Sequence, residues 1–129
     1  MTGATEIWNR ACDPYAPFTH SGDAALAAVL LCHGMAMNGG LLHAVEGLEP
    51  DQLAAATDGY SSLGLGGVAE LITDVSGRAA ALDPDDADAA EQLEIEANRR
   101  FGELVPDDET VSTAFEAHLR AHPEAYAPV

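Results

Sequence analysis

The sequence predicts an all-α protein, a single compact bundle of five to seven helices. Two observations support this fold class. Apolar residues recur at helical spacing in several segments, and no stretch alternates apolar and polar residues for long enough to predict a β-strand. The 129 residues fit one domain, and the 47 % that are apolar can bury a core. We expect residues 1–22 to form an N-terminal arm with a short helix, and residues 23–129 to form the helical domain.

Three helices are predicted in the first half of the chain, over residues 6–11, 23–37 and 41–46. The second of these is apolar on every side, which is typical of a central helix that other helices cover all round. Ser21 is positioned to cap its start. Asn38-Gly39-Gly40 ends it, because asparagine and glycine tolerate the left-handed backbone conformation.

Four further helices are predicted over residues 50–64, 68–82, 83–101 and 107–122. Pro50 suits the first turn of a helix, and Asp83-Pro84 has the pattern of a cap followed by a first-turn proline. The last helix has acidic residues in its first turn, where the positive end of the helix dipole stabilises negative charge. Pro123 lies just past its end.

The net charge is strongly negative, since 22 acidic residues face five arginines and no lysine, which gives −17. Residues 83–109 contain eleven of the acidic residues and two of the arginines, a local net charge of −9. Such a field repels nucleic acid and anionic membranes and attracts cationic partners. We therefore expect a basic protein surface as the partner, with no direct binding of nucleic acid or membrane. The alanine-rich, lysine-free composition leaves a second origin open, in which the acidity is compositional and the acidic face is only solvated.

The cellular compartment is predicted from cysteine usage and from the N-terminus. The chain has two cysteines and no visible secretory signal, which favours the cytoplasm with both thiols reduced. The longest apolar run, residues 24–37, is interrupted by His33 and Gly34 and is shorter than a membrane span.

The candidate partner-binding site lies on the predicted helix over 83–101 and in the acidic segment after it. At about 100° per residue, Leu93, Ala97 and Phe101 fall on a core face and the carboxylates fall on the other side. Such a rigid acidic helix can present carboxylates in place of the phosphates of DNA. One aliphatic residue, Ile95, lies among the carboxylates and could anchor a partner, although single exposed apolar residues are common. The predicted site residues are Asp85, Asp88, Glu91, Ile95, Glu96, Asp107, Asp108 and Glu109.

The order of several features resembles a known bacterial family. These features are an apolar helix that ends in Asn38-Gly39-Gly40, an amphipathic helix pair hinged at Leu63-Gly64, and a terminal helix closing with His122-Pro123 and Tyr126. Over roughly residues 24–126 the chain resembles a bacterial family of unknown function that includes a DNA-mimic protein. The resemblance implies an acidic all-helical domain that can form a homodimer, and a described member that occupies the DNA-binding surface of a transcription regulator. The chain departs from the family pattern after Gly40, where residues 41–45 replace the usual aromatic and amide residues.

Catalytic and metal-binding patterns are weak in this sequence. His118 and His122 have the i, i+4 spacing at which two imidazoles can hold one metal, but His33 or His43 would be needed as a further ligand. Neither cysteine has a neighbouring catalytic pattern. We therefore expect no cofactor and no catalytic residues. The sequence disfavours enzymatic activity but leaves open a small enzyme or metal-dependent protein that uses the histidines.

The leading hypothesis is an acidic protein-binding domain, in its narrower form a DNA mimic that docks on a basic DNA-binding protein. Two alternatives stay open. One is an immunity-like inhibitor of a basic nuclease, which would use the same electrostatics against another target. The other is a small histidine-metal protein.

Overall fold

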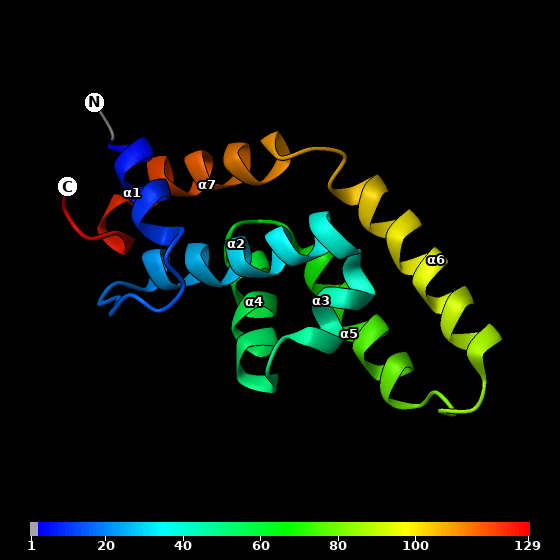
Figure 1. The fold of residues 1–129 in the computed structure, drawn as a ribbon. Coiled ribbons are helices and arrows are strands. Elements are labelled where there is room, and N and C mark those ends of the chain that lie inside the picture. Colours follow the sequence, from blue (N-terminus) through cyan, green and yellow to red (C-terminus); the bar gives the residue numbers. More distant parts are fainter. Residues whose placement is uncertain (1–2) are drawn as a thin grey trace.

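Seven α-helices make up the part of the chain that a computed structural model describes, residues 3–129. This region contains no strand, so the predicted all-α fold is confirmed (Figure 1). The elements are α1 (Ala4–Ala11), α2 (Ser21–Gly39), α3 (Leu41–Gly47), α4 (Pro50–Ser62), α5 (Gly66–Ala80), α6 (Ala87–Leu104), α7 (Glu109–Ala121) and a short 3₁₀ helix, η1 (Pro123–Ala125).

Helix α2 runs through the middle of the molecule and packs against α1, α3 and α4 (Figure 1). Leu26, Val29 and Cys32 are fully buried on its inner side. The prediction that other helices cover α2 all round is wrong, because Leu30, Leu31 and Met35 are only partly buried and Met37 is 51 % exposed. One side of this apolar helix is therefore open to solvent.

Helix α6 lies at the edge of the bundle, where it packs against α3 and α5 (Figure 1). Leu93, Ala97 and Phe101 are buried, as the helical spacing predicts, and the ring of Phe101 lies 6.3 Å from that of His33 on α2. The opposite side of α6 faces solvent. An 18-residue helix extends about 27 Å, so α6 separates the turn before it from the loop after it by that length.

The start of α6 differs from the prediction. The helix begins at Ala87, and Asp86 rather than Asp83 caps it by accepting a hydrogen bond from the Ala89 N–H at 2.9 Å. The Asp83 side chain instead accepts from the Asp85 N–H at 2.9 Å, and the Asp83 carbonyl accepts from the Asp86 N–H at 3.0 Å. These bonds fold residues 83–86 into a turn, so the prediction that Asp85 lies on this helix is wrong.

The other helix boundaries lie close to those predicted. Gly40 ends α2 with a φ of +93°, Pro50 is the first residue of α4, and α7 begins at Glu109. Ser21 is the first helical residue of α2 rather than its cap, and no side chain caps that end. Pro123 follows α7 and opens η1.

A buried ion pair fastens the two ends of the chain to the bundle. Asp23 on α2 is 1 % exposed and accepts two hydrogen bonds from the Arg10 guanidinium, at 3.0 and 2.8 Å. Arg10 also donates to the carbonyl of Ala127 at 2.7 Å, while the other Asp23 oxygen accepts from the Ala127 N–H at 2.7 Å. The segment that follows η1 is thereby held beside α1.

Candidate functional site

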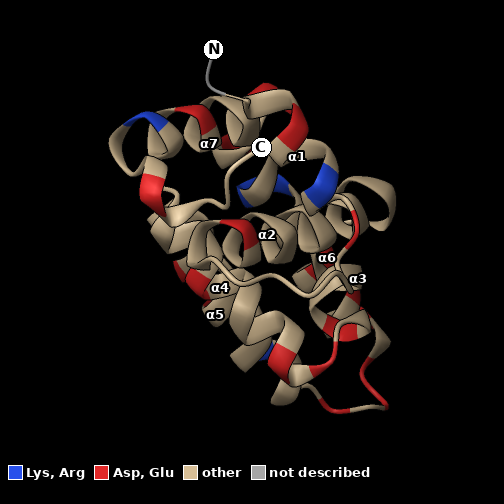
Figure 2. Ribbon diagram, turned by 90° about the vertical axis from the view of Figure 1, so that its left-hand side faces the viewer, with Lys and Arg blue, Asp and Glu red and all other residues tan. Residues whose placement is uncertain are grey.

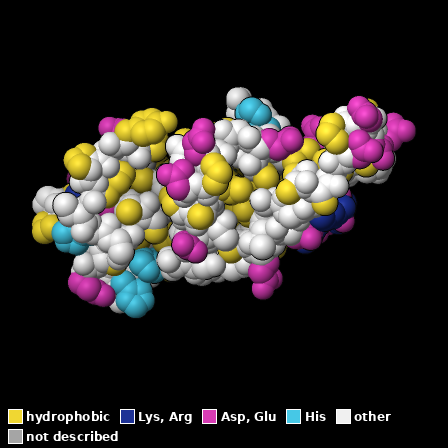
Figure 3. Space-filling model, turned by 90° about the horizontal axis from the view of Figure 1, so that it is seen from below, with side chains coloured by type: hydrophobic (Ala, Val, Ile, Leu, Met, Phe, Trp, Pro, Cys, Tyr) yellow, Lys and Arg dark blue, Asp and Glu magenta, His cyan; other side chains and the backbone are white. Residues whose placement is uncertain are grey.

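The exposed side of α6 and the turn before it carry four of the predicted site residues, Asp85, Asp88, Glu91 and Ile95. Together with Glu94, which was not predicted, they form the surface that we call the α6 acidic face. All five side chains are exposed, and that of Ile95 is 55 % exposed. Figure 3 shows acidic side chains gathered at the end of the molecule where the turn into α6 lies. Asp88 in the first turn also faces the positive end of the helix dipole, which makes an acidic start favourable for α6.

The carboxylates of the α6 acidic face have no basic partner within the described residues. Four arginines form ion pairs elsewhere: Arg10 with Asp23, Arg78 with Glu96 and Asp74, Arg99 with Glu103, and Arg100 with Asp74. In residues 3–129, Asp85, Asp88, Glu91 and Glu94 form no ion pair with arginine or histidine. Figure 2 shows how few arginines stand among the many acidic positions.

Glu96 belongs to a different environment from the one predicted for it. Its carboxylate pairs with Arg78 of α5, and its side chain is only 37 % exposed. Arg78 also lies 3.7 Å from Asp74, and Arg100 of α6 lies 2.6 Å from the same carboxylate. The neighbouring guanidinium of Arg100 keeps the pKa of Asp74 below its usual value. Glu96 therefore helps to join α5 to α6 and is not part of the α6 acidic face.

The second predicted acidic group, Asp107, Asp108 and Glu109, lies at the other end of α6. All three side chains are exposed, but about 27 Å of helix separates them from the turn that contains Asp85. Asp108 also has a partner inside the molecule, because one of its oxygens lies 2.7 Å from Nε2 of His33 on α2. The predicted site is thus two separate acidic regions rather than one continuous surface.

The histidine pair on α7 is joined to an aromatic side chain. The rings of His118 and His122 are 4.9 Å apart, and Nδ1 of His118 lies 2.8 Å from the Tyr126 hydroxyl. Burial lowers the pKa of His118, and His122 lowers it further. Within residues 3–129 no group of three or more His, Cys, Asp or Glu side chains is arranged to hold a metal ion. The arrangement makes His118 a packed, hydrogen-bonded residue.

The two cysteines differ in their surroundings. Burial raises the pKa of the Cys32 thiol to about 11. Cys32 is therefore protonated at neutral pH and behaves as a small core residue. Cys12, at the end of α1, is exposed.

Two side-chain contacts in the structure, Arg10 with Asp23 and His33 with Asp108, were not predicted from the sequence. Arg10 and Asp23 are 13 residues apart, and His33 and Asp108 are 75 residues apart, so no helical spacing connects either pair. The sequence signals were weak: Asp23 lies in the first turn of its helix, where the helix dipole alone favours an acidic residue, and His33 is a polar residue inside an apolar helix.

Comparison of the chain with protein-family models, curated proteins and solved structures finds no match. The resemblance to the family with a DNA-mimic member therefore stays a prediction. No helix within residues 3–129 combines the length and apolarity that crossing a membrane requires.

Proposed function

We propose that this chain is an acidic protein-binding domain whose α6 acidic face docks on a basic protein surface. One observation carries the proposal: these carboxylates are exposed, lack basic partners among the described residues, and stand on a helix whose opposite side is anchored by buried Leu93, Ala97 and Phe101. A preorganised set of like charges binds a complementary surface without first losing contacts within its own chain.

Docking would take place in two physical stages. The net charge of −17 attracts a cationic partner over about one Debye length, roughly 8 Å at physiological salt, and accelerates encounter. At contact, Asp88 and Glu91 accept hydrogen bonds from arginine or lysine side chains of the partner. Ile95, one turn along the helix from Glu91, then adds apolar contact at the same place.

The narrower form of the proposal is a DNA mimic in the cytoplasm. Asp88, Glu91 and Glu94 follow one another at intervals of about 4.5 Å along the helix axis, about a third wider than the rise of about 3.4 Å per charge on one strand of DNA. The support for this form is therefore the repeated presentation of negative charge along a rigid helix, without a match of spacing to the phosphates. The two free thiols fit a reducing compartment.

Charge reversal on α6 tests the proposal. The double variant Asp88→Lys with Glu91→Lys should lose partners that the native protein captures from a lysate, with association to the identified partner slowed at least about tenfold. Capture by the native protein should also weaken between about 0.05 and 0.5 M NaCl.

A matched control separates the α6 acidic face from net charge. Glu70→Lys with Glu116→Lys makes the same change in charge at exposed positions on α5 and α7. This control should retain the captured partner. Equal losses from the two double variants would show that only overall charge matters, and would reject α6 as the docking surface.

A further inference from the structure

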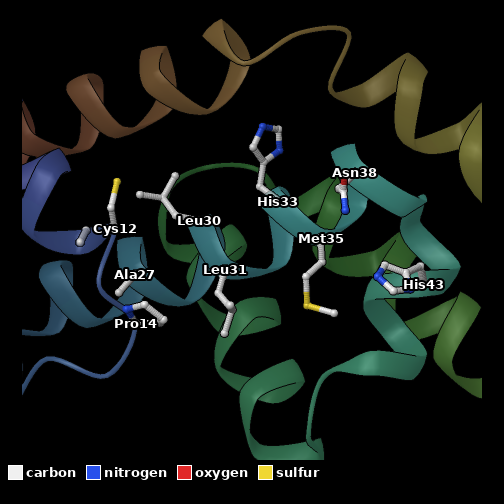
Figure 4. Close-up of a pocket in the computed structure, with 11 residues that line it drawn as sticks. Cys12, Pro14, Ala27, Leu30, Leu31, His33, Met35, Asn38 and His43 are labelled. Atoms are coloured by element: carbon white, nitrogen blue, oxygen red, sulfur yellow. The ribbon is translucent and has the colours of Figure 1, made fainter.

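The open side of α2 is the floor of an apolar groove. Figure 4 shows Leu30, Leu31 and Met35 projecting from α2, with Cys12 at one end of the groove and His43 of α3 at the other. The groove has a volume of about 420 Å³. Its eleven lining residues come from the end of α1 and the loop after it, from α2, and from α3.

The floor has the dimensions of a helix-docking surface. From Ala27 to Asn38 it follows α2 for about three turns, roughly 16 Å. Gly34 lies in the middle and is exposed, and a Cβ added there would meet nothing within 4 Å. With no side chain at this point, another backbone can approach α2 closely between Leu30 and Leu31 on one side and Asn38 on the other.

Three exposed carboxylates stand beside the groove. None of the eleven described lining residues is Asp, Glu or Arg. Asp13 is exposed between two lining residues, and Glu46 is exposed one turn beyond His43 on α3. Asp108 is 81 % exposed and bonded to His33 in the groove wall. A largely apolar floor with carboxylates at its rim is complementary to an apolar stripe flanked by cations.

We propose that this groove binds a basic amphipathic helix of a partner protein. The apolar face of that helix would lie over Leu30, Leu31 and Met35, and its lysine or arginine side chains would reach Asp13, Glu46 and Asp108. Met35 has the flexible side chain that lets such a surface adapt to different apolar residues. A second copy of this chain is the poorer occupant, since it would bring −17 against −17 and one acidic rim against another. The inference does not depend on the proposed role of α6, because none of the lining residues belongs to that helix.

The test uses a fluorescent peptide of about 18 residues with leucine at i, i+3, i+4 and i+7 and lysine elsewhere, measured by anisotropy with the full chain. Gly34→Gln places a side chain on the groove floor. Gly77→Gln is the matched control, because Gly77 is also an exposed glycine inside a helix with nothing within 4 Å of an added Cβ. The peptide dissociation constant should rise about tenfold in Gly34→Gln relative to Gly77→Gln.

A second pair of variants separates the groove from the α6 acidic face. Asp13→Lys with Glu46→Lys should weaken peptide binding about tenfold, and Asp88→Lys with Glu91→Lys, which changes the charge equally, by less than about threefold. Stronger weakening by the α6 pair would place the peptide on α6 and overturn the inference. It would leave the proposed function of α6 intact.

Three other results would also overturn it. The first is equal dissociation constants for Gly34→Gln and Gly77→Gln. The second is equal binding of a scrambled peptide of the same composition, which would mean that charge alone is recognised. The third is self-association that Gly34→Gln abolishes in a protein that does not bind the peptide, which would make the groove an interface between two copies.

Discussion

Asp23 places a carboxylate at the start of the central helix, where it is almost completely shielded from water. A buried charge is tolerable only when it is paired and hydrogen-bonded. Both oxygens of Asp23 are used, one by the Arg10 guanidinium and the other by the Ala127 N–H. A single residue therefore joins α1, α2 and the C-terminal segment.

Replacement of Asp23 by asparagine should destabilise the fold by roughly 3–5 kcal/mol, because it leaves the partly buried charge of Arg10 without its counterion. Urea unfolding followed by circular dichroism would measure the change. Glu103→Gln, which breaks an exposed pair with Arg99, should cost less than about 0.5 kcal/mol. Similar losses in the two variants would contradict the assigned role of Asp23.

At the scale of elements, the junction of α2 and α3 is stabilised by a helix distant in the sequence. Asn98 of α6 accepts a hydrogen bond from the Leu41 N–H at 3.1 Å, which satisfies a donor at the start of α3. A Cβ at Gly40 would lie 2.7 Å from that Asn98 oxygen. Gly40 thus combines a positive φ with close packing against α6.

The two roles of Gly40 predict a contrast between two glycine substitutions. Gly40→Ala should destabilise the protein by at least about 1–2 kcal/mol, since alanine is strained at a φ of +93° and would also displace Asn98. Gly77→Ala lies within α5, where nothing obstructs the new methyl group, and should stabilise by about 0.5–1 kcal/mol. Thermal unfolding of both variants would measure the two effects. If both substitutions changed the stability in the same direction, the result would contradict the structure at Gly40.

The helices could be predicted because their signals are local. Asn38-Gly39-Gly40, Pro50 and the spacing of Leu93, Ala97 and Phe101 each act within a few residues, and the structure agrees with them. The contact of Gly40 with Asn98 depends on residues 58 positions apart, and no local pattern contains it. The start of α6 was misplaced because two aspartates, Asp83 and Asp86, both fit a cap and the turn uses the first.

The candidate site was predicted only in part for the same reason. Asp88, Glu91 and Ile95 are exposed as the helical geometry requires. The geometry of one helix could not reveal that Arg78 of α5 reaches Glu96, because that contact is set by how α6 packs against α5. The separation of Asp85 from Asp107 does follow from the length of the predicted helix, and grouping the two acidic clusters as one site overlooked it.

At the scale of the whole molecule, the excess of negative charge opposes the compact state. The ion pairs of the four arginines offset only a small part of 22 carboxylates. The remaining repulsion acts between exposed groups, where dissolved ions screen it.

Stability should therefore increase with salt. The free energy of unfolding is expected to rise when NaCl is raised from about 0.01 to 0.5 M at pH 7, because screening removes repulsion that unfolding would otherwise relieve. Urea titrations at several salt concentrations would measure it. Near pH 4.2, the isoelectric point of the sequence, the same titration should show little dependence on salt. A stability that is flat or falls with NaCl at pH 7 would mean that self-repulsion is not significant.

The attachment of the C-terminal segment to Arg10 puts both chain ends on one side of the molecule, opposite the turn that leads into α6 (Figure 1). A tether at either end would consequently hold the protein in nearly the same orientation, with Asp85 and Asp88 pointing away from the support. Immobilisation through the N-terminus or through the C-terminus should leave the same surface free for a partner in solution.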